Sequence, residues 1–141
     1  MSRVINTDST GKQRNQALRT IAELLRRLSQ KSEIDDDAKD MAAHLVVCLR
    51  DIDAGIDSSA AAWEKRDYWM KADELRMRWA WAGSMAAQIQ QMVLEGHWQD
   101  LPTMMVKLMP RVSDIDVNKL TRKESTWRGS YSRLIFENPN R

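Results

Sequence analysis

The sequence contains little of what ends a helix or closes a covalent loop: its 141 residues include five glycines, three prolines and one cysteine. A single cysteine, Cys48, excludes an internal disulfide and the usual multi-cysteine zinc site. The lack of a disulfide framework favours a reducing compartment, so we expect a cytoplasmic protein. Between Gly11 and Gly96 the chain has no proline and only two further glycines, which favours long helices.

Long apolar runs are also missing. No run reaches the roughly 20 residues that a membrane-spanning helix needs, and the N-terminal segment MSRVINTDSTGK has no apolar signal region. Hydrophobic residues make up 43% and charged residues 30% of the chain, a composition that excludes a disordered chain of low hydrophobicity. We therefore expect a soluble protein of one domain with no membrane partner.

The apolar residues that are present recur at helical spacing and predict an all-α fold. Helices are expected over residues 10–31, 36–56 and 59–95, with a short fourth helix from Asp100. The break between the second and third helices is placed from Gly55 to Ser58, although these helices could also form one continuous rod. The third helix, closed by Gly96, would be the long central helix of an up-and-down bundle. The single domain would comprise an N-terminal arm over 1–9, a bundle over 10–112 and a basic, irregular tail over 113–141 whose aromatic residues dock on the bundle.

This central helix has two apolar stripes, where an ordinary surface helix has one. On a wheel of 100° per residue, one stripe, which includes Tyr68, Leu75 and Trp79, has the spacing of a core seam. The second stripe lies on the opposite side, and its members are Trp63, Met70, Met77, Trp81, Met85 and Met92. The aromatic residues of AWEKRDYWMKADELRMRWAWAG would then lie on opposite faces and could not converge on one substrate.

The second stripe has two interpretations, internal core or a surface that meets another chain. Methionine and tryptophan suit an interface, because thioethers adapt to the partner's shape and tryptophans supply a large contact area. Because the helix is longer than its neighbours can cover, we expect a homo-oligomer, with a dimer as the first expectation. The leading hypothesis is a helical interaction or scaffold protein that binds itself or a partner protein through this stripe.

Basic residues are concentrated at the two ends of the chain, and the segment 34–62 is acidic. Lys12, Arg19 and Arg26 repeat every seven residues along the first helix, with Arg27 beside them. The tail adds basic residues around Trp127, namely Lys119, Arg122, Lys123 and Arg128. Such a stripe can be a solvated face or can pack against the acidic second helix. The alternative function is a nucleic-acid-binding or ribonucleoprotein subunit that contacts phosphates through these residues.

Catalytic and metal-binding patterns are weak. Asp40, His44 and Cys48 are spaced four residues apart on the second helix, which permits a metal site. This spacing arises easily by chance and Cys48 lies among apolar residues, so we expect no metal and no cofactor. The sequence has no phosphate-binding glycine loop, nucleophile elbow or Glu-x-x-His pair. We therefore predict no catalytic residue, no small-molecule substrate and a protein that is not an enzyme.

Three segments also carry a resemblance to known sequences: INTDSTGKQR near the start, AWEKRDYWMKAD in the middle and TWRGSY near the end. With them the chain resembles a group of small, uncharacterised bacterial proteins of about this length, over nearly its whole extent. The resemblance implies a cytoplasmic, all-helical protein. It implies no activity, ligand or site residue.

Overall fold

The computed structural model describes residues 7–139, and within this range the chain is all-helical and has no strand. The expected all-α fold is therefore confirmed. Residues 1–6 of the expected N-terminal arm lie outside the described residues, and residues 7–9 belong to the first helix. The helices and the short 3-10 turns are α1 (Thr7–Ser29), α2 (Asp36–Lys65), α3 (Trp69–Glu95), η1 (Trp98–Asp100), α4 (Leu101–Leu108), η2 (Met109–Arg111), η3 (Glu124–Thr126) and α5 (Ser130–Glu137).

The two ends of the α2–α3 pair follow local signals in the sequence. Asp35 caps α2, since its carboxylate accepts the backbone N–H of Ala38 at 2.8 Å. Gly96 ends α3 with a left-handed φ of 70°, and the N–H of His97 donates back to the carbonyl of Met92. A left-handed glycine with this hydrogen bond is a frequent helix terminus. The predicted end of the long helix at Gly96 is therefore confirmed.

The predicted break at Gly55 to Ser58 is wrong, and so is a single helix over 59–95. α2 continues through Gly55, where a Cβ atom would lie 3.4 Å from Cγ2 of Thr10 in α1, an ordinary van der Waals contact. The chain turns instead at Asp67, which has a φ of 65°. The N–H of Asp67 donates to Glu64, and that of Tyr68 donates to Trp63. These two hydrogen bonds form a Schellman motif, with aspartate in the position that glycine usually takes.

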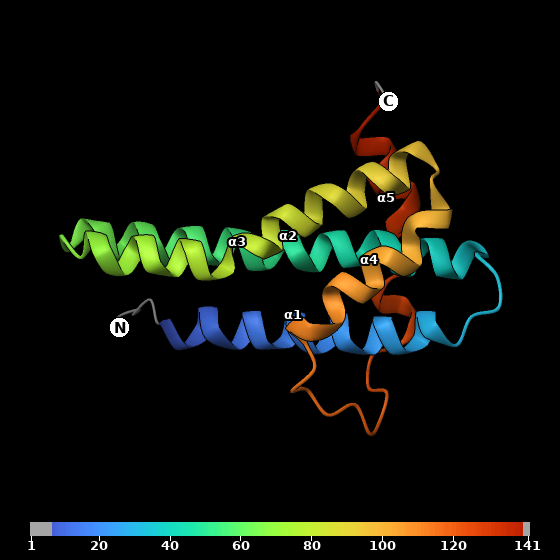
Figure 1. Cartoon of the computed structure of the whole chain (residues 1–141), viewed down its shortest axis with the longest axis horizontal. Helices are drawn as coiled ribbons and strands as arrows, with labels where there is room; N and C mark the ends of the chain where they lie inside the picture. Colours follow the sequence, from blue (N-terminus) through green and yellow to red (C-terminus); the bar gives the residue numbers. More distant parts are fainter. Residues whose placement is uncertain (1–6, 140–141) are drawn as a thin grey trace.

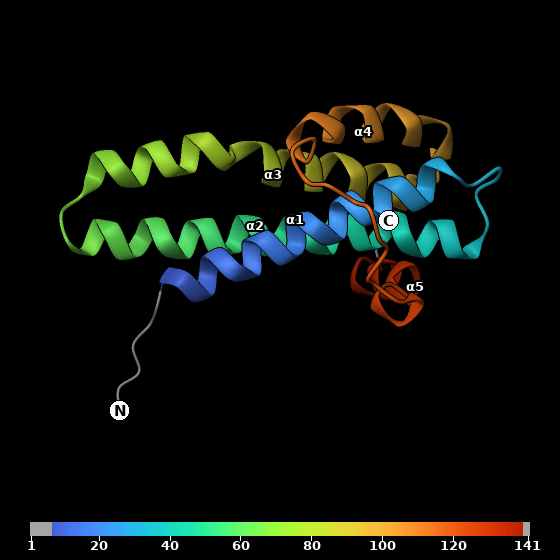
Figure 2. The same cartoon turned by 90° about the horizontal axis from the view of Figure 1, so that it is seen from below.

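The fold is therefore built on an antiparallel α2–α3 hairpin, not on one long central helix. In Figures 1 and 2, α2 and α3 run side by side, α1 packs on α2 along the lower side of Figure 1, and α4 lies across the second half of α3. α5 packs on α2. The turn end of the hairpin projects beyond α4 and α5 (Figure 1). We call the hairpin over residues 57–80 the arm.

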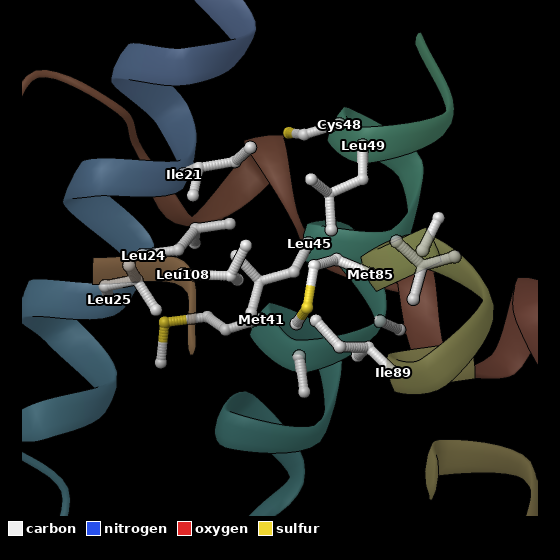
Figure 3. Packing of buried hydrophobic residues seen from close by; sticks show 14 of the residues in the cluster. Ile21, Leu24, Leu25, Met41, Leu45, Cys48, Leu49, Met85, Ile89 and Leu108 are labelled. Atoms are coloured by element: carbon white, nitrogen blue, oxygen red, sulfur yellow. The ribbon is translucent and has the colours of Figure 1, made fainter. Parts of the chain in front are cut away.

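The core lies where α1, α2, α3 and α4 meet (Figure 3). Its completely buried side chains include Leu24 from α1, Leu45 from α2, Ile89 from α3 and Leu108 from α4. Burying a leucine or isoleucine side chain contributes about 1.5–3 kcal/mol, so this region supplies most of the hydrophobic stabilisation. The arm lies outside it, and fewer helices cover its residues.

After α4, which packs on α3, the chain crosses to the other side of the α2–α3 pair. It crosses α1 as an extended loop and then forms α5 on α2 (Figure 1). Trp127 and Leu134 from this segment are 2% and 3% exposed and belong to the core, whereas Phe136 is 82% exposed. The aromatic residues of the tail therefore divide between the core and the surface.

Candidate interaction surface

The second apolar stripe of the long segment divides into a buried half and an exposed half. Met85 and Met92 are 6% and 3% exposed and belong to the core cluster. Met70 and Met77, on the same side of α3 but nearer the turn, are each 78% exposed. The core interpretation therefore holds for Met85 and Met92, whereas Met70 and Met77 are exposed.

The position of α4 explains this division. Nζ of Lys107 in α4 donates to Oε1 of Gln88 in α3 at 2.9 Å. At the end of η2, the guanidinium of Arg111 stacks over the ring of Trp81, 5.0 Å from its centroid. α4 and η2 therefore cover the outer side of α3, the side that carries the second stripe, only as far as Trp81. Met77 and Met70 continue this side toward the turn, and no described helix covers them.

Two aromatic residues at the turn add to the exposed methionines. Tyr68 is 51% exposed and Trp69 is 57% exposed. We call Tyr68, Trp69, Met70 and Met77 together the arm surface. Isolated exposed apolar side chains are ordinary on proteins, but four large ones within ten residues at the end of a projecting hairpin form a candidate binding surface.

Trp63 was predicted to lie in the same helical stripe as Met70, and this is wrong because the turn at Asp67 separates them. Trp63 lies on α2 and is half-buried. Nζ of Lys71 lies 5.6 Å from the ring centroids of both Trp63 and Tyr68. This cation–π contact links the two sides of the turn.

Residues 79 and 81 leave α3 on nearly opposite sides, about 160° apart, but the expectation that their aromatic rings stay apart is wrong. The ring centroids of Trp79 and Trp81 are 5.8 Å apart. The guanidinium of Arg14 in α1 stacks 5.0 Å from the Trp79 ring, just as Arg111 covers Trp81. The two rings therefore form an adjacent pair at the base of the arm, covered by cations from two other elements, and Trp81 marks the border between covered and uncovered α3.

Ionic and steric contacts hold the arm together. The guanidinium of Arg76 in α3 binds the carboxylates of Asp57 and Glu64 in α2, with 3.3 Å between Nη2 and the Asp57 oxygen. On the core side of the arm, Gly83 allows α2 and α3 to approach closely, since a Cβ atom there would lie 3.0 Å from the carboxylate of Asp53. The arm surface is thus carried by paired helices rather than by a loop.

The basic side of α1 does not form the predicted free stripe, because the chain's own tail lies on it. Arg19 donates to the carbonyls of Asp116 and Lys119 at 2.9 and 2.7 Å. Arg26 donates to the carbonyl of Val117. Arg27 donates to the carbonyl of Arg122 at 3.0 Å and also stacks over Trp127, 5.0 Å from the ring centroid.

The basic residues of the tail have separate positions. Arg122 points inward, where Nε donates to the hydroxyl of Thr20 at 2.9 Å and Nη2 donates to Oε1 of Gln16 at 2.6 Å. Arg128 forms a surface ion pair with Glu124 at 3.1 Å. Lys12, Lys119 and Lys123 are exposed. Five of the eight residues predicted to contact phosphate therefore already bind groups of the protein itself, namely Arg19, Arg26, Arg27, Arg122 and Arg128.

Sequence reasoning missed Glu23, which anchors the tail on α1. Its side chain is fully buried. Oε1 accepts the backbone N–H groups of Thr121 and Arg122, both at 2.8 Å, and Oε2 accepts the Nε–H of Arg19 at 2.8 Å. Burial by itself would raise the pKa of Glu23, but the hydrogen bonds from Arg122, Thr121 and Arg19 outweigh it and lower the pKa to about 2. The only sequence signal was the four-residue spacing from Arg19, which many surface pairs share.

Asp40 and His44 support α5, and Cys48 is a buried core residue. The carboxylate of Asp40 accepts the N–H groups of Gly129 and Tyr131 at 3.1 and 2.9 Å, at the start of α5. Nδ1 of His44 lies 3.2 Å from Oγ of Ser130. Within residues 7–139 no three metal-binding side chains are grouped.

A groove of about 830 Å³ runs between α1 and α2, lined among others by Lys12, His44, Cys48 and Asp51. Burial raises the pKa of the Cys48 thiol to about 12, which leaves it protonated and without nucleophilic character near neutral pH. Burial also lowers the pKa of His44. This groove therefore offers polar contacts without an activated cysteine.

Among the described helices, none combines the length and the apolar character needed to cross a membrane. Comparison of the chain with protein-family models, with curated proteins and with solved structures found no match.

Proposed function

We propose that this chain is a non-enzymatic helical interaction protein that binds another protein chain through the arm surface. The observation that carries the proposal is the end of the α4–η2 cover at Trp81. Beyond this point the outer side of α3 keeps its apolar character, and Met70 and Met77 are each 78% exposed. A stripe that is core at one end and uncovered at the other is expected where a partner completes the packing.

The residue types of the arm surface suit protein binding. Methionine side chains are flexible and polarizable, so they adapt to a partner's shape. Tryptophan and tyrosine are enriched among residues that dominate binding energy. The surface lies on paired helices that Arg76 connects, and binding to such a surface orders few additional groups, which lowers its entropic cost.

The basic side chains of α1 already bind groups of the protein itself, which also favours the arm surface as the binding site. The guanidinium groups of Arg19, Arg26 and Arg27 contact carbonyls of the tail, so phosphate binding by α1 would require the tail to leave. The arm surface needs no rearrangement before a partner binds.

Site-specific photo-crosslinking in the protein's own cell tests this function. A photoreactive phenylalanine analogue would replace Met77 in one variant and Phe136 in a matched control, since Phe136 is 82% exposed but lies on α5. We expect covalent adducts with a protein from position 77 and not from position 136, detected by gel shift and mass spectrometry. No adduct at position 77, or equal adducts at both positions, would refute the function.

A further inference from the structure

We infer that the partner of the arm surface is a second copy of this chain, with the two α3 helices antiparallel and related by a two-fold axis near Met77. This inference rests on the proposed function and specifies its partner. Three features of α3 carry it: the spacing of the methionines, the order of charges beside them and the extent of the uncovered surface.

The methionines supply a narrow, regular contact line. Met70 and Met77 are seven residues apart, so they project within about 20° of each other on α3. Seven-residue spacing keeps an apolar line facing a neighbouring helix along its length. Two such helices can therefore pack against each other with methionines from both at the centre.

The charges beside this line are self-complementary. Glu74 and Arg78 lie about 40° apart on the same flank of the methionine line, and both are exposed. Within the described residues neither forms an ion pair. In a two-fold interface, any contact from one residue to another occurs twice. Antiparallel α3 helices bring Glu74 of each copy level with Arg78 of the other, so both acidic groups meet basic groups.

The size of the surface sets the strength of the pairing. From Trp69 to Trp81, α3 extends about 18 Å, and the arm is two helices wide. Two arms packed in this way form a four-helix arrangement, which is a stable way to cover helical hairpins. Stable complexes usually bury about 800 Å² per partner, and a contact line about 18 Å long is short for an area of that size. We therefore expect a concentration-dependent dimer with a dissociation constant in the micromolar range.

Sedimentation equilibrium of the purified chain over a wide range of concentrations tests the inference. We expect dimers that dissociate on dilution. Met77→Asp should raise the dissociation constant at least tenfold, because it places a carboxylate at the centre of the apolar line. Phe136→Asp, an equally exposed change on α5, should leave the constant unchanged. Circular dichroism would verify that both variants retain their helical content.

A charge exchange tests the antiparallel arrangement itself. Glu74→Arg alone and Arg78→Glu alone should each weaken the dimer by about fivefold, because each places like charges opposite one another in both copies. The double variant should restore wild-type association. A dimer that responds to none of these changes overturns the inference, as does a chain that stays monomeric at all concentrations.

The two proposals fail separately. If the purified chain is monomeric but position 77 forms adducts with a different protein in the cell, the arm surface binds a partner protein, and that partner is not a second copy of this chain. If the chain is monomeric and position 77 forms no adduct, both proposals are wrong.

Discussion

Glu23→Gln keeps the size of a buried side chain and removes its charge, so it measures how strongly the tail is anchored on α1. In the native protein both carboxylate oxygens accept hydrogen bonds, from the backbone of Thr121 and Arg122 and from the guanidinium of Arg19. A glutamine has one carbonyl oxygen, and its NH₂ group would face donors on the other side. We expect the variant to be folded but less stable.

The magnitude follows from the pKa of Glu23, which is about 2 in the folded protein against an ordinary value of 4.5. A difference of one unit corresponds to about 1.4 kcal/mol, so the charge contributes about 3 kcal/mol to the free energy of unfolding near neutral pH. Because the folded pKa is the lower one, this contribution is complete above the unfolded pKa and decreases as the pH falls toward the folded pKa. Near pH 3 only about 1.4 kcal/mol should remain.

Urea denaturation of the wild type and the variant, near pH 7 and near pH 3, provides the measurement. The difference in unfolding free energy should be about 3 kcal/mol at the higher pH and less than half of that at the lower. Glu124→Gln is the matched control: the carboxylate of Glu124 forms an exposed ion pair with Arg128, so the loss of its charge should cost less than about 1 kcal/mol. An equal cost of Glu23→Gln at both pH values would refute the role of its charge.

Three further predictions concern the turn, the tail and the cysteine. Asp67→Val should lower the free energy of unfolding by about 1–2 kcal/mol, because a β-branched residue is strained at a φ of 65°. Asp67→Asn should be nearly neutral, and thermal melts that rank the two variants the other way would contradict this. Trp127→Phe removes the indole N–H that donates to Asp37 at 2.7 Å. Because that bond lowers the pKa of Asp37, the pKa should rise in an NMR titration of the variant. An unchanged Asp37 titration would show that the bond does not act on it. Labelling of Cys48 by a thiol reagent near pH 8 should be at least about 100-fold slower in the native protein than in urea, because its thiol is buried and its pKa is about 12. Comparable labelling rates would contradict the buried, protonated state.

Local signals were sufficient to predict much of the helical framework. The apolar spacing of residues 17–28 and the glycine at position 96 each indicate structure that their neighbours in sequence determine. The break between α2 and α3 was misplaced because Gly55 was interpreted as a helix breaker. α2 instead continues through this residue, and Asp67 takes the left-handed position at the actual turn.

The burial of individual residues in the second stripe could not be predicted from the sequence. Its periodicity correctly indicated a second apolar side of α3 but could not show which members would be covered. That depends on how far α4 extends along α3, and α4 is fixed by contacts such as Lys107 with Gln88 that join distant parts of the chain. Met85 and Met77 look equivalent in the sequence, and only the position of α4 distinguishes them.

The basic residues of α1 were misjudged for a different reason. Their partners are backbone carbonyls of Asp116, Val117 and Lys119, and every residue type carries a carbonyl, so no sequence pattern marks such an acceptor. Glu23 was missed in the same way, because two of its donors are backbone N–H groups.

The anchoring of the tail by Glu23 also determines when folding can be completed during synthesis. Glu23 and its donor at Thr121 are 98 residues apart, so a growing chain places Glu23 on α1 long before Thr121 and Arg122 leave the ribosome. Until then the carboxylate can remain ionised only if it stays hydrated, which keeps this side of α1 open to water. The late arrival of the two N–H groups closes that side, since contacts of such long sequence separation form late. A nascent chain that stalls before residue 121 is therefore expected to expose the face of α1 that the finished protein covers, and to be open to proteases there.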